Sequence, residues 1–206
     1  MKSRVVVLKT KPETVLEDYG KLLDKANYKK FIPKDVKTIL KLNLSWSKYF
    51  PACSTEPWQL EGVVKKMQKD GYKKLVPVEN RTVVTDVWNG ARGNKWLPIL
   101  DRYGLKYQPL TDVKWINYKP KHEMLALHKI FDDGHQIPEI FIGTNVVHMS
   151  TIKCHGHTQI TGSLKNAFGG LITEKRHHCH KMIHEVLVDL LQIQKEIHKG
   201  IFAVAD

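Results

Sequence analysis

The chain has 206 residues, of which 42% are hydrophobic and 26% charged, a composition typical of a globular domain with a sizeable core. Because 33 lysines and arginines outnumber 21 acidic residues, the formal net charge is +12 and the surface is expected to attract anions. No apolar run is as long as the roughly 20 residues of a membrane-spanning helix, and the three widely spaced cysteines argue against a disulfide framework and cannot supply the four thiolates of an iron–sulfur cluster.

The first half of the chain alternates strand-like and helix-like segments, which indicates an α/β layered fold. The patterns predict strands at residues 5–9, 36–44 and 75–78, and helices at residues 12–26, 55–69 and 96–103. The segment from Asn89 to Gly93, N-G-A-R-G, predicts a turn-rich loop. Since the N-terminus has only a short apolar run before Lys9, it is predicted to be a first strand and not a signal peptide, and we expect a cytoplasmic protein.

The second half continues this alternation and ends unusually. The predicted elements are one or two strands within 105–115, extended chain at 124–131, a turn at 132–134, a core strand at 140–147, a helix at 176–198 and a strand at 201–205. A parallel sheet rarely ends on a strand without its outgoing loop, because ligand loops leave from the carboxyl ends of strands. We therefore expect a single α/β domain over residues 1–206, with a mostly parallel open sheet flanked by helices, that is the N-terminal portion of a longer protein. A genuine C-terminal strand is the alternative.

The segment K-C-H-G-H-T-Q-I-T-G-S-L-K-N-A-F-G-G, residues 153–170, predicts a ligand-binding loop, because a hydrophobic core does not need this mixture of residues. Lys153 would lie at the end of a buried strand and Lys165 near the start of a short helix, where free backbone N–H groups attract anions. Thr161 can cap this helix or donate to phosphate oxygens, and Gly162 lets the backbone approach a ligand closely. The alternative is that Thr161 only caps the helix and Lys165 is solvated.

Three further polar residues extend this predicted site. Asn166 follows Lys165 directly, while Lys41 and Asn43 lie at the end of the strand predicted at residues 36–44. In an open α/β sheet, ligands bind at the carboxyl ends of the strands. We therefore expect Lys41 and Asn43 to face the 153–170 loop across a pocket for an anionic small molecule or cofactor.

Two histidines of the same loop are candidate catalytic residues. His155 and His157 alternate with a glycine, so in extended chain both would point to the same side. There they could ligate a metal or act as acid–base groups together with Lys165. A structural histidine bonded to backbone carbonyls is the alternative for either of them.

A second histidine cluster lies at residues 177–184. His180 and His184 are separated by four positions, a spacing that can clamp zinc if both lie on one helix. The sequence lacks the glutamate that follows the first histidine in H-E-x-x-H metalloproteases. The alternative is an exposed helix start.

The chain resembles a known family over nearly its whole length. Lys41, Asn43 and Leu44 resemble the K-x-N-L strand end of domain-of-unknown-function family 362, and Ser54 to Pro57 resembles its S-T-x-P helix start. Its K-T-H…T-G…L-K-N-x-F-G signature is similar to the block formed here by Lys153, His155, Thr158, Thr161, Gly162, Leu164, Lys165, Asn166, Phe168 and Gly169.

The resemblance implies a cytoplasmic α/β protein of redox or cofactor metabolism, because members are generally longer and often joined to ferredoxin-type iron–sulfur modules. The implied partner is a ferredoxin-type protein or the missing C-terminal half. Two features depart from the family: Cys154 replaces the usual small residue, and the glycine-rich half after Asp206 is absent. The spacing of His155 and Lys165 also resembles the histidine–lysine pair of nickel-pincer lactate racemases, which implies metal ligation or proton movement.

These observations support three hypotheses. The first is binding of an anionic small molecule or cofactor, with redox or proton-transfer chemistry and with a metal ion or a partner's iron–sulfur cluster as cofactor. The second is a non-catalytic metal-binding module using the histidine cluster. The third is nucleic-acid binding through the +12 surface, although no zinc finger or long basic helix is present.

Overall fold

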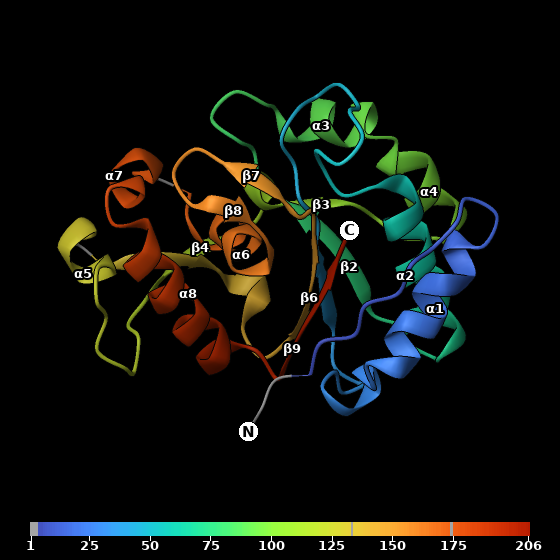
Figure 1. Ribbon diagram of the computed structural model, residues 1–206. Helices are drawn as coiled ribbons and strands as arrows, with labels where there is room; N and C mark the ends of the chain where they lie inside the picture. Colours follow the sequence, from blue (N-terminus) through green and yellow to red (C-terminus); the bar gives the residue numbers. More distant parts are fainter. Residues whose placement is uncertain (1–3, 133, 174) are drawn as a thin grey trace.

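A five-stranded sheet forms the centre of the computed structural model, which describes residues 4–132, 134–173 and 175–206 (Figure 1). The strand order is β3-β2-β1-β6-β9, and each neighbouring pair is parallel. The strands are β1 (Thr38–Lys41), β2 (Leu75–Glu79), β3 (Gln108–Pro109), β6 (Asn145–Ser150) and β9 (Gly200–Ala205). The prediction of an α/β fold with a mostly parallel sheet flanked by helices is confirmed.

Helices cover both faces of the sheet (Figure 1). One layer contains α1 (Val15–Lys25), α2 (Pro57–Lys69), α3 (Val87–Gly93) and α4 (Trp96–Arg102). The other contains α5 (Leu127–Ile130), α6 (Ser163–Leu171), α7 (Arg176–His180) and α8 (Ile183–Ile197), together with the hairpin of β4 (Trp115–Tyr118) and β5 (His135–Pro138). Because both faces are covered, adjacent residues of β1 belong to opposite cores: Leu40 packs with the first layer and Ile39 with the second.

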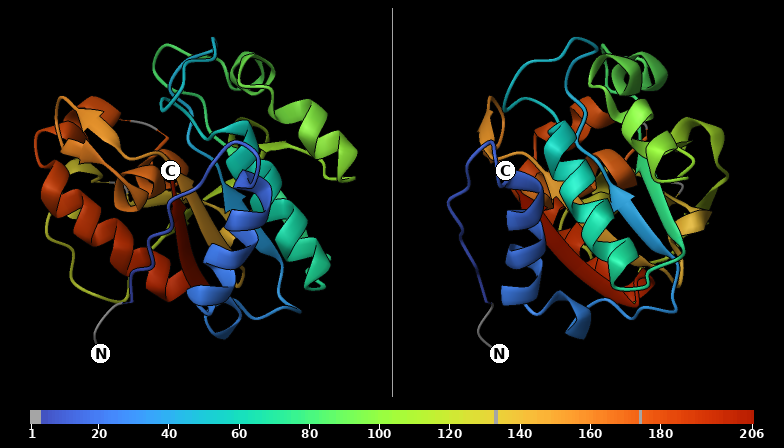
Figure 2. Two further views of the ribbon diagram at one scale, coloured as in Figure 1. Left: turned by 45° about the vertical axis from the view of Figure 1, so that its right-hand side comes forward. Right: turned by 90° about the vertical axis from the view of Figure 1, so that its right-hand side faces the viewer.

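α1 and α2 lie side by side over one face of the sheet (Figure 2). They approach closely because Gly62 has no side chain, and a Cβ atom there would lie 2.8 Å from Cβ of Tyr19. α2 begins at Pro57, whose fixed φ suits a first helical turn. It ends just before Gly71, whose φ of 90° reverses the chain, so the predicted helix and its stop are both confirmed.

Residues 89–93 were predicted to be a loop, and they form most of the helix α3. The Asp86 side chain caps this helix by accepting a hydrogen bond of 2.8 Å from the Asn89 backbone N–H. The glycines of this segment serve packing: a Cβ atom at Gly90 would lie 2.5 Å from Cδ1 of Leu44, and one at Gly93 would overlap the Ser47 carbonyl oxygen. The turn prediction was wrong because these glycines allow close approach and not a turn.

The strand predicted at residues 5–9 is also wrong. This segment pairs with no strand in the described part of the chain, and Val5 and Val7 are 82% and 89% exposed. A short run of β-branched residues is compatible with a strand, but it becomes one only where a sheet edge supplies hydrogen-bond partners.

Three predictions in the second half need correction. Residues 124–131 are not extended, because the buried Asp189 carboxylate accepts hydrogen bonds of 2.8–3.0 Å from three successive backbone N–H groups and starts α5 there. The core strand begins only at Asn145, after a 3-10 turn and Gly143 with φ of 72°. The helix predicted at 176–198 breaks near Met182 into α7 and α8. The predicted turn at 132–134 includes Asp133, which lies outside the described residues.

Other boundaries are close to the predicted ones. The strand predicted at 36–44 is the shorter β1, that at 75–78 is β2, and that at 201–205 is β9 at one edge of the sheet. One or two strands were expected near a sheet edge within 105–115; β3 lies there at an edge of the central sheet, and β4 begins at Trp115. Among the described helices, none has the length and apolar character needed to cross a membrane.

Buried histidines lie between β6 and α8. His148 Nε2 lies 2.6 Å from Oε1 of Gln194, and His198 Nδ1 lies 3.3 Å from Oγ1 of Thr144. Burial lowers the pKa of His148 to about 4. Burial, with a smaller contribution from His148, lowers the pKa of His198 to about 3. Both imidazoles are therefore neutral in the folded protein at neutral pH.

We expect the free energy of unfolding to fall as the pH decreases from about 6.5 toward 4. In this range the unfolded chain binds protons on His148 and His198, whose ordinary pKa is 6.5, whereas the folded protein does not, so acid favours unfolding. Urea denaturation at a series of pH values measures this slope. His148→Gln, which retains an N–H donor toward Gln194, should reduce the slope by up to one proton. An identical slope in the variant would contradict the assignment.

Candidate functional site

The ligand-binding segment predicted at 153–170 is a hairpin followed by the short helix that was expected after Gly162. β7 (Lys153–His155) pairs antiparallel with β8 (Gln159–Thr161), so that Lys153 lies opposite Thr161. Gly162 then caps α6, with its carbonyl accepting a hydrogen bond of 2.9 Å from the Asn166 N–H. Because this unit follows β6 directly, it lies at the carboxyl end of the parallel sheet, where Figure 1 shows the hairpin above the strands.

A cavity of about 330 Å³ lies between this hairpin–helix unit and the ends of β1 and β2. Its lining includes most of the predicted site residues, namely Lys41, Asn43, Lys153, His155, Thr161, Lys165, Asn166 and His180. His157, Gly162 and His184 are not part of the lining. Glu79, Asn80 and Arg176 line the cavity and were not predicted. A smaller cavity of about 200 Å³ lies beside β5, lined in part by His135, away from the strand ends.

A buried ion pair forms the floor of the cavity. Lys41 Nζ donates to Oε1 of Glu79 at 2.6 Å, to the Leu42 carbonyl at 2.6 Å and to Oδ1 of Asn166 at 3.2 Å. The Asn166 amide in turn donates to the Lys41 carbonyl at 3.0 Å. Burial lowers the pKa of Lys41 and raises that of Glu79, and the contact between the two groups opposes both shifts. The ends of β1 and β2 and the first turns of α6 are thus held together by one polar network.

Lys153 joins the hairpin to the segment that follows β1. Its Nζ donates to Oδ1 of Asn43 at 2.9 Å, to Oγ of Ser45 at 2.6 Å and to the Cys53 carbonyl. Burial lowers the pKa of Lys153. The prediction that the β1 end faces the 153–170 segment is therefore confirmed for Asn43, since these two residues are in direct contact.

Positive charge gathers in the cavity. Lys41, Arg81, Lys153, Lys165 and Arg176 line it, and Glu79 supplies the one opposing carboxylate among the residues that the structure describes. Burial, together with the nearby cations Arg176 and Lys41, lowers the pKa of Lys165 to about 8. Its ammonium group lies 4.1 Å from the centre of the Phe168 ring. The lysine therefore titrates near physiological pH.

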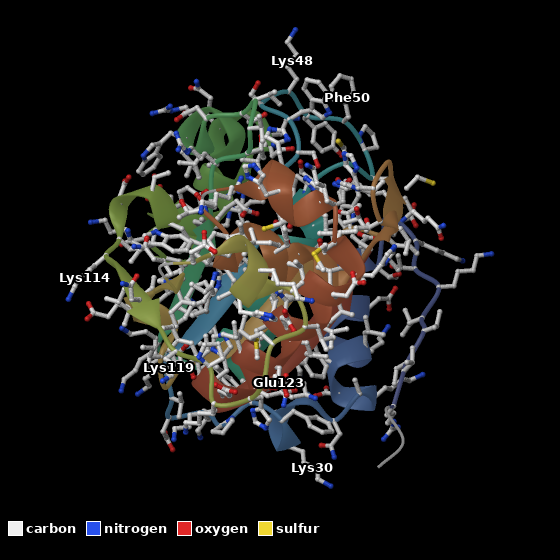
Figure 3. All side chains as sticks on the ribbon, turned by 90° about the vertical axis from the view of Figure 1, so that its left-hand side faces the viewer. Lys30, Lys48, Phe50, Lys114, Lys119 and Glu123 are labelled. Atoms are coloured by element: carbon white, nitrogen blue, oxygen red, sulfur yellow. The ribbon has the colours of Figure 1, made fainter. Side chains whose placement is uncertain are left out.

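Other lysines lie on separate parts of the surface. Lys30, Lys48, Lys114 and Lys119 project outward from different elements around the periphery in Figure 3. Lys114 is 69% exposed at its side chain and contacts Glu139 at 3.1 Å. The concentration of cations in the cavity is thus a local feature and not a consequence of the overall +12 charge alone.

Three imidazoles from two separate segments lie together, and two of them, those of His155 and His180, line the cavity. The His180 ring is stacked on that of His157 at a centroid distance of 4.5 Å and on that of His155 at 6.0 Å. Burial, then Lys165 and the neighbouring histidines, lowers the pKa of His180 to about 4, and burial also lowers the pKa of His155. In the described residues no group of three or more histidine, cysteine or acidic side chains is arranged to hold a metal ion.

The helix break separates the two histidines of the predicted zinc clamp. His180 ends α7 and lines the cavity, while His184 lies on α8 and is exposed. The single helix on which that prediction rested is therefore absent. His180 instead joins His155 and His157, a grouping that the sequence spacing did not indicate.

Several buried polar atoms of the cavity lining have no hydrogen-bond partner within the described ranges. They are Glu79 Oε2, Asn80 Nδ2, Thr161 Oγ1, Arg176 Nη2 and both ring nitrogens of His180. A buried polar group without a partner costs about 1–3 kcal/mol. Their gathering on one cavity is explained if a polar ligand supplies the missing partners.

The family model for a domain of unknown function, DUF362, matches residues 38–206. The chain belongs to the DUF362 family. The matched range contains every residue of the cavity lining, from Lys41 to His180. Searches of the curated proteins and of the solved structures found no significant match. The resemblance drawn from the sequence is confirmed, and the family description assigns no activity.

A simple signal could have identified Glu79 and Asn80. They follow the buried strand residues of β2 just as Lys41 and Asn43 follow those of β1, and carboxyl ends of neighbouring parallel strands share one edge. Arg176 had no such signal, because it is brought to the cavity by the chain between α6 and α7.

We expect Lys165 to be acetylated by acetic anhydride with a pH midpoint near 8, and Arg176→Gln to raise that midpoint because a neighbouring cation is removed. Mass spectrometry of the peptide containing Lys165 measures the rate at each pH, and Lys165→Arg removes the signal as a control. A midpoint at the ordinary lysine value of 10.5 that is insensitive to Arg176 would contradict the described environment.

We expect Lys41→Met to decrease the free energy of unfolding by about 3–5 kcal/mol, because it leaves the Glu79 carboxylate buried without its cation. The double variant Lys41→Met with Glu79→Leu should recover much of this loss, since no buried charge remains. Urea denaturation compares the two proteins. Equal losses in the single and double variants would show that the ion pair does not control the stability of this edge.

Proposed function

We propose that this DUF362 protein binds an anionic small molecule or cofactor in the cavity at the carboxyl ends of its strands and promotes proton transfer there. One observation carries the proposal: cationic side chains and unpartnered buried polar atoms from β1, β2, β7, α6 and α7 converge on a single cavity. A cavity of this volume is within the range of small-molecule sites. Structural packing alone gives no reason to collect like charges in one buried place.

The cations have different tasks in this proposal. Lys41 and Lys153 are already held by several protein acceptors, so they supply a fixed positive potential. Lys165 and Arg176 have fewer contacts, and the Nη2 atom of Arg176 has no hydrogen-bond partner within the part of the chain that is described, so these two groups contact the anion directly. Nε and Nη1 of Arg176 donate to the Ile172 and Arg81 carbonyls at 3.0 and 2.6 Å, so Nη2 is the nitrogen left for the anion.

The proton-transfer role falls on Lys165, His155 and His180. With a pKa lowered to about 8, Lys165 can both lose and regain a proton near pH 7. In this proposal His155 and His180 take up a proton from a bound substrate; burial lowers the pKa of both imidazoles, that of His180 to about 4, so each releases the proton again readily. His157 stacks on His180 and is exposed, which suits exchange of that proton with solvent.

A redox role with an iron–sulfur partner rests on the family resemblance. The thiols of this chain do not fit a cluster: Cys179 is buried in the core, and burial raises its pKa to about 11. The remaining two cysteines cannot complete a four-thiolate set. In this proposal a ferredoxin-type partner or a further part of the protein would therefore carry the cluster, and the cavity would hold the molecule that exchanges electrons with it.

Isothermal titration calorimetry with pyrophosphate and citrate as probes tests the proposal. We expect at least one probe to bind with one-to-one stoichiometry, and the double variant Lys165→Ala with His155→Ala to weaken binding at least tenfold because it removes a cation and an imidazole from the cavity. Lys30→Ala with Lys114→Ala is the matched control, since it removes exposed lysines elsewhere on the surface.

Binding that is unchanged in the cavity variant would refute the proposal, whatever the surface control shows. If binding is to nucleic acid, with a steep salt dependence and no effect of the cavity variant, the basic surface is responsible instead. Metal analysis of the purified protein tests the metal-binding alternative, which requires bound metal that is lost in His180→Ala with His184→Ala.

A further inference from the structure

Among the residues that the structure describes, Glu79 is the acidic residue of the cavity lining, and one of its carboxylate oxygens has no hydrogen-bond partner. The Oε1 atom of Glu79 accepts hydrogen bonds from Lys41 Nζ at 2.6 Å and from the Asn80 backbone N–H at 2.8 Å. The Oε2 atom of the same carboxylate is buried and has no partner among residues 4–132, 134–173 and 175–206. The whole residue is 3% exposed and belongs to the cavity lining. One oxygen is thus held by the protein and the other is left for a ligand.

The surroundings shield this carboxylate from bulk water. Gly169 of α6 lies above the ion pair, and a Cβ atom there would lie 3.5 Å from Lys41 Nζ and 3.7 Å from Glu79 Oε1. Gly169 and Gly170 therefore let α6 pack closely over the ion pair, since a Cβ atom at Gly170 would lie 3.0 Å from Cε of Lys41.

A simple anion leaves this carboxylate unsatisfied. A fully ionised phosphate ester or an unsubstituted carboxylate offers acceptors to Lys165 and Arg176, but offers no donor to Glu79 and repels it. A ligand that satisfies the whole cavity must combine acceptors for the cations with one hydrogen-bond donor for Oε2. An ammonium group would be repelled by the lysines and arginines of the lining, which are Lys41, Arg81, Lys153, Lys165 and Arg176, so a neutral hydroxyl is the donor that suits this environment.

We propose that the ligand of this cavity is a hydroxylated dianion, a hydroxy-carboxylate or a hydroxyl-bearing phosphate ester, whose hydroxyl donates to Oε2 of Glu79. This inference rests on the proposed function and specifies its ligand. The acidic groups of the ligand contact Lys165 and Arg176, and Glu79 distinguishes the hydroxylated molecule from its deoxy analogue. Glu79 is then a specificity-determining residue.

Two matched pairs of probes test this, each differing by one hydroxyl: malate against succinate, and glycerol 3-phosphate against propyl phosphate. Calorimetry with the wild-type protein should give a dissociation constant at least tenfold lower for the hydroxylated member of one pair, since a hydrogen bond to a buried charged group is worth about that factor. The pair that shows the effect identifies the acidic group as a carboxylate or a phosphate.

Glu79→Gln gives a second test of the same contact. The carbonyl oxygen of the introduced amide is expected to take the position that accepts from Lys41 and Asn80, which places an amide N–H, a donor, where Oε2 was. The ratio of the dissociation constants of the deoxy and hydroxylated probes should therefore fall from at least tenfold to about onefold. The deoxy probe should also bind more tightly to Glu79→Gln than to the wild-type protein. Glu139→Gln, the same change at an exposed site, should leave the ratio unchanged. Circular dichroism establishes that Glu79→Gln is folded, and the wild-type ratios decide the question if it is not.

The outcomes separate this inference from the proposed function. Equal binding of both members of each pair, lost in Lys165→Ala, overturns the hydroxyl assignment and leaves anion binding intact. Aspartate binding more tightly than malate also overturns it, because the donor would then be an ammonium. If none of these probes, pyrophosphate or citrate binds, the proposed function fails and the inference fails with it.

Discussion

The buried ion pair between Lys41 and Glu79 is the interaction on which the functional edge of this fold depends. It joins the ends of two neighbouring strands, and Asn166 attaches the first turns of α6 to the same network through hydrogen bonds in both directions. A buried pair seldom adds stability over well-packed apolar residues, because both charges lose their hydration. Its retention at this place is therefore better explained by what it positions, since it fixes β1, β2 and α6 around one cavity.

The packing of α6 shows how closely the helix and this pair fit each other. A Cβ atom at Gly170 would lie 3.0 Å from Cε of Lys41, and Gly169 is nearly as close to its ammonium group. The F-G-G end of the 153–170 segment thus serves two purposes: Phe168 packs in the core beneath the cavity, and the glycines admit the lysine. Glycine within a helix costs about 1 kcal/mol relative to alanine, a cost that the placement of Lys41 offsets.

The cavity is electrostatically unbalanced by itself. Three features of the cavity have one physical cause: its cations repel one another, the pKa values of Lys165 and His180 are lowered, and buried polar atoms lack partners. The cause is that charged and hydrogen-bonding groups have been removed from water without complete compensation inside the described part of the protein. Proteins tolerate such local conflict where a ligand resolves it. An anion that carries a hydrogen-bond donor would relieve the repulsion and satisfy Glu79 at the same time.

The sequence by itself determined the layered α/β class, most of the central strands and the polar residues at their ends, because strand and helix periodicities are local and parallel strands direct their carboxyl ends to one edge. It also predicted a binding element at residues 153–170, most of whose chosen side chains line the cavity. Only the tertiary structure decided which groups meet: Glu79 and Arg176 at the cavity, His180 beside His155 and His157, and His184 away from them. Local patterns could not show that Asp189 starts α5, that Gly90 and Gly93 admit Leu44 and Ser47, or that the helix at 176–198 breaks. The contacts of Asp189, Gly90 and Gly93 join residues far apart in the chain, and such contacts exist only after the layers have packed.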